Sequence, residues 1–132
     1  MNKSKEPHWL TEAQVRLLHT EVLHFGGSSG LRDQGMLQSV LARPVHRYEY
    51  GKEVDLFDLA AAYGFGLAKN HSFIDGIKRV ALIAMRAFLF QNGRHFAPGR
   101  IETVTFMEGL ASGVFAEDEI ATWLRASSQP RE

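Results

Sequence analysis

One stretch of the chain, HSFIDGIKR at residues 71–79, combines an imidazole, a carboxylate and two cations within nine residues. A strongly apolar helix is predicted over about 76–92, so the last residues of this stretch lie in its first turn. The first turn of a helix has unpaired N–H groups and the positive end of the helix dipole, so it can bind an anion. Lys78 adds a point charge there, and the Arg79 guanidinium can fork two phosphate oxygens. Cations are disfavoured at this end of a helix, which favours a bound anion beside them.

The other residues of this stretch complete a set suited to phosphoryl or nucleotidyl transfer. Asp75 offers the hard oxygen ligands that Mg²⁺ prefers when it bridges a protein to substrate phosphates. His71 can take a proton from an attacking hydroxyl, and Gly76 has no side chain to block the approach to the helix start. Each also has a structural interpretation: Asp75 as a helix cap, His71 as a structural histidine, and Lys78 with Arg79 as a solvated first turn. The other five histidines lack metal-binding spacing.

The elements that must position this stretch are mostly helical. Local signals predict an all-α domain of about six helices with a short extended flap. Five of the predicted helices cover about 11–24, 33–43, 76–92, 101–112 and 117–126, and the third begins at Asp55 with an apolar stripe that runs to Leu67. The whole chain, 1–132, is predicted to be one domain, with frayed tails at 1–9 and 127–132.

Caps and glycines set the boundaries of these helices. Thr11 and Gln14 form a capping-box pattern, and Asp55 is expected to cap the third helix. Gly64 and Gly66 inside that helix each cost roughly 0.8–1 kcal/mol relative to alanine, which we attribute to close packing against neighbouring helices. Gly93 is expected to end the apolar helix.

The predicted flap lies between the second and third helices. Pro44 is expected to end the second helix, because the residue before a proline disfavours helical backbone. Over residues 45–54 the helical period is lost, and Tyr48 and Tyr50 alternate with polar neighbours. A short hairpin or extended flap is therefore predicted there.

Composition limits the classes of function. The 132 residues contain 15 Lys+Arg, 15 Asp+Glu and no cysteine, which excludes disulfides and thiol catalysis. Residues 69–100 nevertheless carry six positive groups against one negative, a net charge of +5. The zero total charge and the lack of a recognition-helix pattern argue against direct nucleic-acid binding. No apolar run is long enough for a membrane span and the start is polar, so a cytoplasmic protein is expected.

The stretch HSFIDGIKR resembles the signature of the Fic/Doc family, H-x-F-x-[D/E]-[A/G]-N-[K/G]-R. Lysine rather than glycine at position 78 points to the Doc, or "death on curing", branch. The segments FGGSSGLRDQGMLQSVLARP (25–44) and DLAAAYGFGLAKNHSF (58–73) also resemble Doc sequences. The resemblance covers roughly residues 10–125 and implies the helical bundle of that family.

This resemblance implies a toxin of a toxin–antitoxin pair that moves a phosphoryl group from a nucleoside triphosphate such as ATP to a hydroxyl of elongation factor Tu. It implies that His71 is the base, Asp75 the Mg²⁺ ligand and Gly76 part of the anion hole. It also implies that Lys78 and Arg79 hold the triphosphate. The flap with Tyr48 and Tyr50 would dock the target's backbone by strand addition, and a Phd-type antitoxin would silence the toxin.

Position 77 departs from the family pattern, because isoleucine replaces the motif asparagine. An amide aimed at a phosphate oxygen is worth, by analogy with an oxyanion-hole donor, roughly 3 kcal/mol or 10²- to 10³-fold in rate. Ile77 belongs to the nucleotide-binding residues by its position in the motif, and it is expected to weaken phosphoryl transfer. It could be a natural loss of activity or a mutation selected because the intact toxin kills its host. Two alternatives remain open: an inactive module that captures an antitoxin peptide, and AMP transfer as in Fic relatives.

Overall fold

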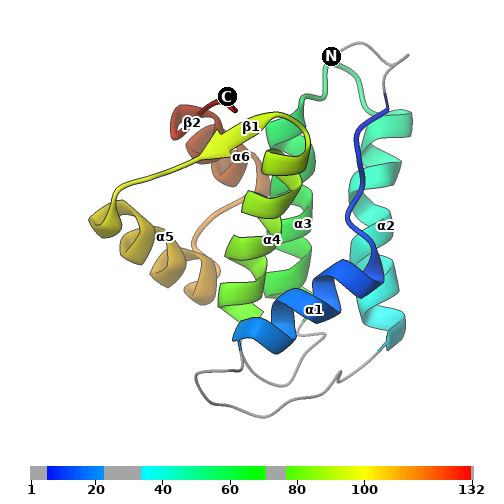
Figure 1. Ribbon diagram of the computed structural model, residues 1–132, viewed down its shortest axis with the longest axis horizontal. Coiled ribbons are helices and arrows are strands. Elements are labelled where there is room, and N and C mark those ends of the chain that lie inside the picture. Colours follow the sequence, from blue (N-terminus) through cyan, green and yellow to red (C-terminus); the bar gives the residue numbers. More distant parts are fainter. Residues whose placement is uncertain (1–5, 23–33, 71–76, 132) are drawn as a thin grey trace.

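A computed structural model of the chain describes residues 6–22, 34–70 and 77–131. Within these ranges it contains six α-helices and one antiparallel pair of short strands (Figure 1). The all-α prediction and the helix number are therefore confirmed. The elements are, in chain order, α1 (Glu12–Val22), α2 (Gln34–Tyr50), α3 (Leu56–Asn70), α4 (Ile77–Gln91), β1 (Arg94–Phe96), α5 (Arg100–Ser112), α6 (Glu117–Ala126) and β2 (Ser128–Pro130).

Helices α3 and α4 lie side by side at the centre, with α2 on one side and α5 on the other (Figure 1). The fully buried side chains of α3 and α4 form most of the core, among them Leu59, Tyr63, Leu67, Val80, Met85, Phe88 and Leu89. This confirms the prediction that the apolar segment after residue 76 is enclosed by other helices. None of the helices in the described ranges is long and apolar enough to cross a lipid bilayer.

The predicted helix caps of α1 and α3 are present. The Thr11 hydroxyl accepts from the Gln14 N–H at 3.1 Å, and the Gln14 side chain accepts from the Thr11 N–H at 2.9 Å. Asp55 caps α3 in the same reciprocal way, with Asp58 as its partner at 2.9 and 3.0 Å. Each pair satisfies N–H groups that the first helical turn leaves unbonded.

The second helix does not end before Pro44, as the sequence predicted, but continues to Tyr50. Proline in a helix interior removes one backbone hydrogen bond and costs about 3 kcal/mol. The residues after it supply contacts that offset this cost. Tyr48 is buried and packs edge-on against Trp9 at 5.6 Å between ring centroids, and Arg47 pairs with Glu117 of α6. Both contacts are made by residues of the helix beyond the proline.

The described parts of the two predicted frayed tails are held in place. The His8 N–H donates to the Asn92 side chain at 2.7 Å, and the Trp9 ring stacks on Phe88 at 6.0 Å. At the other end, β2 pairs with β1 in antiparallel register, with His95 opposite Gln129. The prediction of loose ends is therefore wrong for residues 6–9 and 127–131.

Candidate functional site

Four helix ends lie at the end of the molecule where α3 ends and α4 begins (Figure 1). Helix α3 ends at Asn70 and α4 begins at Ile77, so the two flank residues 71–76. The end of α1 and the start of α2 lie at this same end of the molecule, at the bottom of Figure 1. His71, Asp75 and Gly76 fall outside the described residues, and their roles remain predictions.

The structure does place the last three residues of the motif, which begin α4. Ile77 is the first residue of α4, and Lys78 and Arg79 lie in its first turn, with Arg79 exposed. No acidic residue stands in that turn. The first-turn N–H groups and two cationic residue types are thus combined at one helix start, an arrangement that favours an anion.

Close packing between α3 and α4 fixes the two helix ends relative to each other. A Cβ placed on Gly64 of α3 would lie 2.8 Å from Cγ of Met85 and would also overlap its Sδ. A Cβ on Gly66 would lie 3.0 Å from Cγ1 of Val40 in α2. Both glycines therefore permit a close approach of neighbouring helices, which confirms the reason predicted for them.

The predicted flap with Tyr48 and Tyr50 is wrong in both conformation and place. These tyrosines lie on the last turn of α2, Tyr48 buried and Tyr50 81% exposed. The α2–α3 connection is at the top of Figure 1, at the start of α3, whereas residues 71–76 follow its end. A helix of 15 residues spans about 22 Å. The tyrosines therefore do not border the predicted site, and no strand is available there for strand addition.

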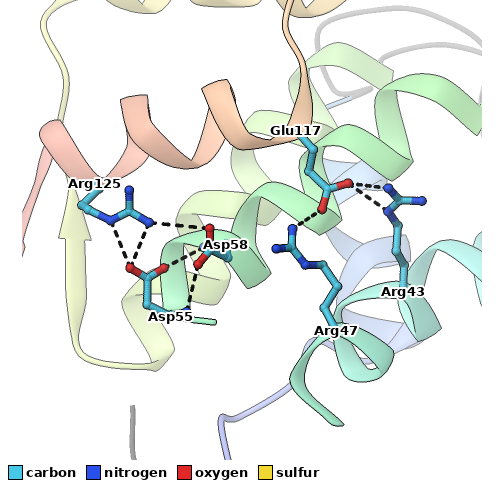
Figure 2. A network of polar contacts seen from close by, with 6 residues as sticks. All are labelled: Arg43, Arg47, Asp55, Asp58, Glu117 and Arg125. Carbon is cyan, nitrogen blue, oxygen red and sulfur yellow. Dashed lines mark hydrogen bonds and ion pairs between the residues drawn. The ribbon is translucent and has the colours of Figure 1, made fainter. Parts of the chain in front are cut away.

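Figure 2 shows a charged cluster that the sequence-based analysis missed. Glu117, at the start of α6, accepts hydrogen bonds from Arg43 and Arg47 of α2, the latter at 2.6 Å. The Glu117 side chain is only 13% exposed. The i, i+4 spacing of two arginines on one helix could have indicated a shared anionic partner. That partner, however, is about 70 residues away in sequence. This cluster joins α6 to α2.

A second cluster in Figure 2 joins the other end of α6 to α3. Arg125 contacts Asp55 at 2.9 Å and Asp58 at 3.6 Å. Burial acts to raise the pKa of Asp55, but hydrogen bonds from Asp58 and Arg125 outweigh it and the pKa is lowered. Burial and the neighbouring Asp55 carboxylate raise the pKa of Asp58 above its usual value. The α3 cap is thereby also the anchor of α6.

A cavity of about 570 Å³ lies between α2 and α3. Its lining includes Arg43, His46 and Arg47 of α2 with Phe65 and Lys69 of α3. It was not predicted, because the cationic residues come from separate segments.

As for metals, the described part of the chain contains no group of three or more His, Cys, Asp or Glu side chains placed to hold an ion. The predicted ligand Asp75 is outside that part.

Comparison with known proteins agrees with this arrangement. Residues 9–89 match the model of the Fic/DOC family. The chain is 30% identical over 119 residues to "Protein kinase doc" of Escherichia phage P1, covering 89% of this chain and 93% of that protein. It is 43% identical over 75 residues to "Toxin Doc" of Mycolicibacterium smegmatis, covering 55% of this chain and 57% of the relative. From its helical bundle, the motif that spans the start of α4 and these matches, the chain belongs to the Fic/Doc family.

Proposed function

We propose that this protein is the toxin of a toxin–antitoxin pair and transfers a phosphoryl group from a nucleoside triphosphate to a hydroxyl of a target protein. The observation that carries the proposal is the family motif HSFIDGIKR, whose last three residues form the first turn of α4. The names of the two relatives, one a protein kinase and one a toxin, support it. Elongation factor Tu in the cytoplasm is the proposed target, and a Phd-type antitoxin is the proposed partner.

In the proposed reaction the hydroxyl oxygen of the target forms a bond to the terminal phosphorus of the triphosphate. The bond from that phosphorus to the bridging oxygen breaks, and the nucleoside diphosphate leaves. His71 takes the proton of the hydroxyl as a general base. The N–H groups at the start of α4, together with Lys78 and Arg79, hold the phosphate oxygens and offset their charge. Gly76 leaves room for the phosphates to approach this turn.

The donor set of the motif fits a magnesium ion. Asp75 is its one carboxylate and lies two residues before the first residue of α4. One carboxylate together with substrate phosphate oxygens is a common set of Mg²⁺ ligands. When bound, the ion would neutralise part of the negative charge on the phosphates. Asp75 would therefore hold Mg²⁺ beside the anion site.

We expect Ile77 to weaken phosphoryl transfer at this site. It occupies the first position of α4, where the motif has an asparagine. Its hydrocarbon side chain neither donates nor accepts a hydrogen bond. The loss of one donor to a phosphate oxygen costs about 10²- to 10³-fold in rate. The backbone N–H groups and the cations remain, so we expect nucleotide binding to persist while transfer is slow.

The same residue favours a second candidate function, an inactive module that binds an antitoxin peptide. Ile77 is the observation behind it, because isoleucine supplies no hydrogen-bonding group where the motif has asparagine, and α4 is present from this residue onward. AMP transfer, as in Fic relatives, is a further candidate. Lys78 argues against it, because a lysine would occupy space that the glycine of Fic relatives leaves free.

The test compares the present chain with Ile77→Asn in a bacterial translation extract supplied with ATP labelled at the terminal phosphate. We expect the asparagine variant to label a translation factor about 10²- to 10³-fold faster and to arrest translation, with mass spectrometry showing an added phosphate. Ile77→Leu, an apolar control at the same position, should remain as slow as the present chain.

Other outcomes identify the alternatives. Equal rates for the asparagine and leucine variants would contradict the role given to Ile77. An added AMP in place of phosphate would establish the Fic-type reaction. No labelling by any variant, together with tight binding of an antitoxin, would establish the binding module.

A further inference from the structure

The cavity between α2 and α3 is lined by cationic and aromatic residues and contains no carboxylate in its lining. The polar and aromatic residues that matter are Ser39, Arg43, His46, Arg47, Phe65 and Lys69. Its volume of about 570 Å³ is within the usual range for ligand sites. A site of this composition is complementary to an anionic group.

The charges around the cavity are not balanced within the described structure. Arg43 and Arg47 share the single carboxylate of Glu117. Lys69 has no carboxylate within ion-pair distance among the described residues; its ammonium lies over the Phe65 ring, 5.1 Å from the centroid. Three permanent cations therefore meet one carboxylate, which leaves a net charge of +2 that a bound anion would reduce.

The aromatic residue of the cavity, Phe65, contacts two of these cations. The Arg43 guanidinium lies 5.4 Å from the centroid of the same Phe65 ring that Lys69 covers. The negative face of the ring attracts both cations. The ring is thus engaged by two cations rather than open for a stacked base, which favours a carboxylate ligand over a nucleotide.

The position of the cavity connects it with the proposed transfer site. Lys69 is the penultimate residue of α3, two residues before His71. A segment bound along α2 and α3 would therefore approach the motif from its N-terminal side. The lining contains no residue of α4, whose start is the proposed triphosphate site.

We propose that this cavity binds an acidic segment of the target polypeptide and so holds the hydroxyl-bearing protein beside the motif. One carboxylate would pair with Lys69, and the partly exposed Arg43 would attract the same segment. Glu117 shows that this region binds carboxylates, because Arg43 and Arg47 already donate hydrogen bonds to its side chain. This inference rests on the proposed function for the identity of the partner, but the binding itself requires no nucleotide and no transfer.

The test is a titration of the ¹⁵N-labelled chain with a glutamate-rich peptide containing one serine, followed by NMR at low salt without nucleotide. We expect amide shifts concentrated in the two cavity segments, residues 39–47 and 65–69. Lys69→Gln should weaken binding about fivefold. Arg100→Gln removes the same charge from α5, on the other side of α4 from α2 (Figure 1), and should bind as the unmodified chain does.

Three results would overturn the inference. The first is no shift in the cavity segments, and the second is an equal loss of affinity for the lysine and arginine variants, which would indicate general charge attraction. The third is displacement of the peptide from the cavity by inorganic pyrophosphate at a lower concentration than free glutamate requires, which would identify a phosphate site. Because no transfer is measured, a failed titration leaves the phosphotransfer proposal intact, and a failed transfer assay leaves this binding result intact.

Discussion

Gly64 of α3 lies directly against Met85 of α4, with no space for even a methyl group between them. This contact lies in the α3–α4 pair that flanks residues 71–76. We expect Gly64→Ala to destabilise the fold by about 1–2 kcal/mol in urea unfolding, because overpacking outweighs the gain in helix propensity. In the double variant with Met85→Ala the two losses should be less than additive, since the shorter side chain makes room. An unchanged or higher stability of Gly64→Ala would contradict the close packing.

Tyr63 anchors the N-terminal segment to the core. Its buried hydroxyl oxygen accepts from the Leu10 N–H at 3.0 Å. Tyr63→Phe leaves that donor unpaired and should cost about 1–3 kcal/mol in the free energy of unfolding near neutral pH. A loss well below this range would show that another acceptor replaces the hydroxyl.

The same tyrosine should make the free energy of unfolding depend on pH in the alkaline range. Burial raises the pKa of Tyr63 from 10.0 to about 12 in the folded state, although the Leu10 hydrogen bond acts in the opposite direction. A raised pKa means that the folded state holds the proton longer than the unfolded state. Its contribution to stability is therefore complete below pH 10 and decreases as the pH rises to about 12. Unfolding measured over this interval should show a steeper loss for the unmodified chain than for Tyr63→Phe; parallel curves would contradict the assignment.

Glu117 should contribute to stability through its two arginines. The Glu117 side chain is largely buried between Arg43 and Arg47, and its neutralisation leaves two cations without their carboxylate. We expect Glu117→Gln to cost about 1–2 kcal/mol, more than a fully exposed pair because of its partial burial. Asp118→Asn removes the same charge from the neighbouring exposed position of α6. Equal losses of unfolding free energy for the two variants would mean that the contacts of Glu117 with the two arginines do not contribute to stability beyond the net charge of the protein.

Local signals predicted the parts of the fold that depend on neighbours in sequence. The capping box of Thr11 and Gln14 involves residues three positions apart, and Asp55 stands directly before an apolar helical stripe, so both caps can be recognised without a structure. The apolar run of α4 and the two glycines of α3 likewise indicated central, closely packed helices. Family membership followed from the motif, which is continuous in the chain.

Long-range contacts explain the features that sequence reasoning did not predict. The helix continues past Pro44 because Tyr48 reaches Trp9 and Arg47 reaches Glu117, and both partners are distant in sequence. The C-terminal residues pair with β1, more than 30 positions earlier. The cationic cavity likewise combines α2 with α3. Such partners cannot be recognised from periodicity, which reports only which face of an element is buried.

The central proposal is that the motif at residues 71–79, which includes the first turn of α4, forms a triphosphate site. Isothermal titration of the chain with a non-hydrolysable ATP analogue and Mg²⁺ tests it most directly, with Arg79→Gln compared with Arg86→Gln, an equal loss of charge on the exposed surface of the same helix. The account predicts binding by the unmodified chain and by Arg86→Gln, and a loss of about tenfold or more for Arg79→Gln. Absence of binding, or equal affinities for the two variants, would contradict it.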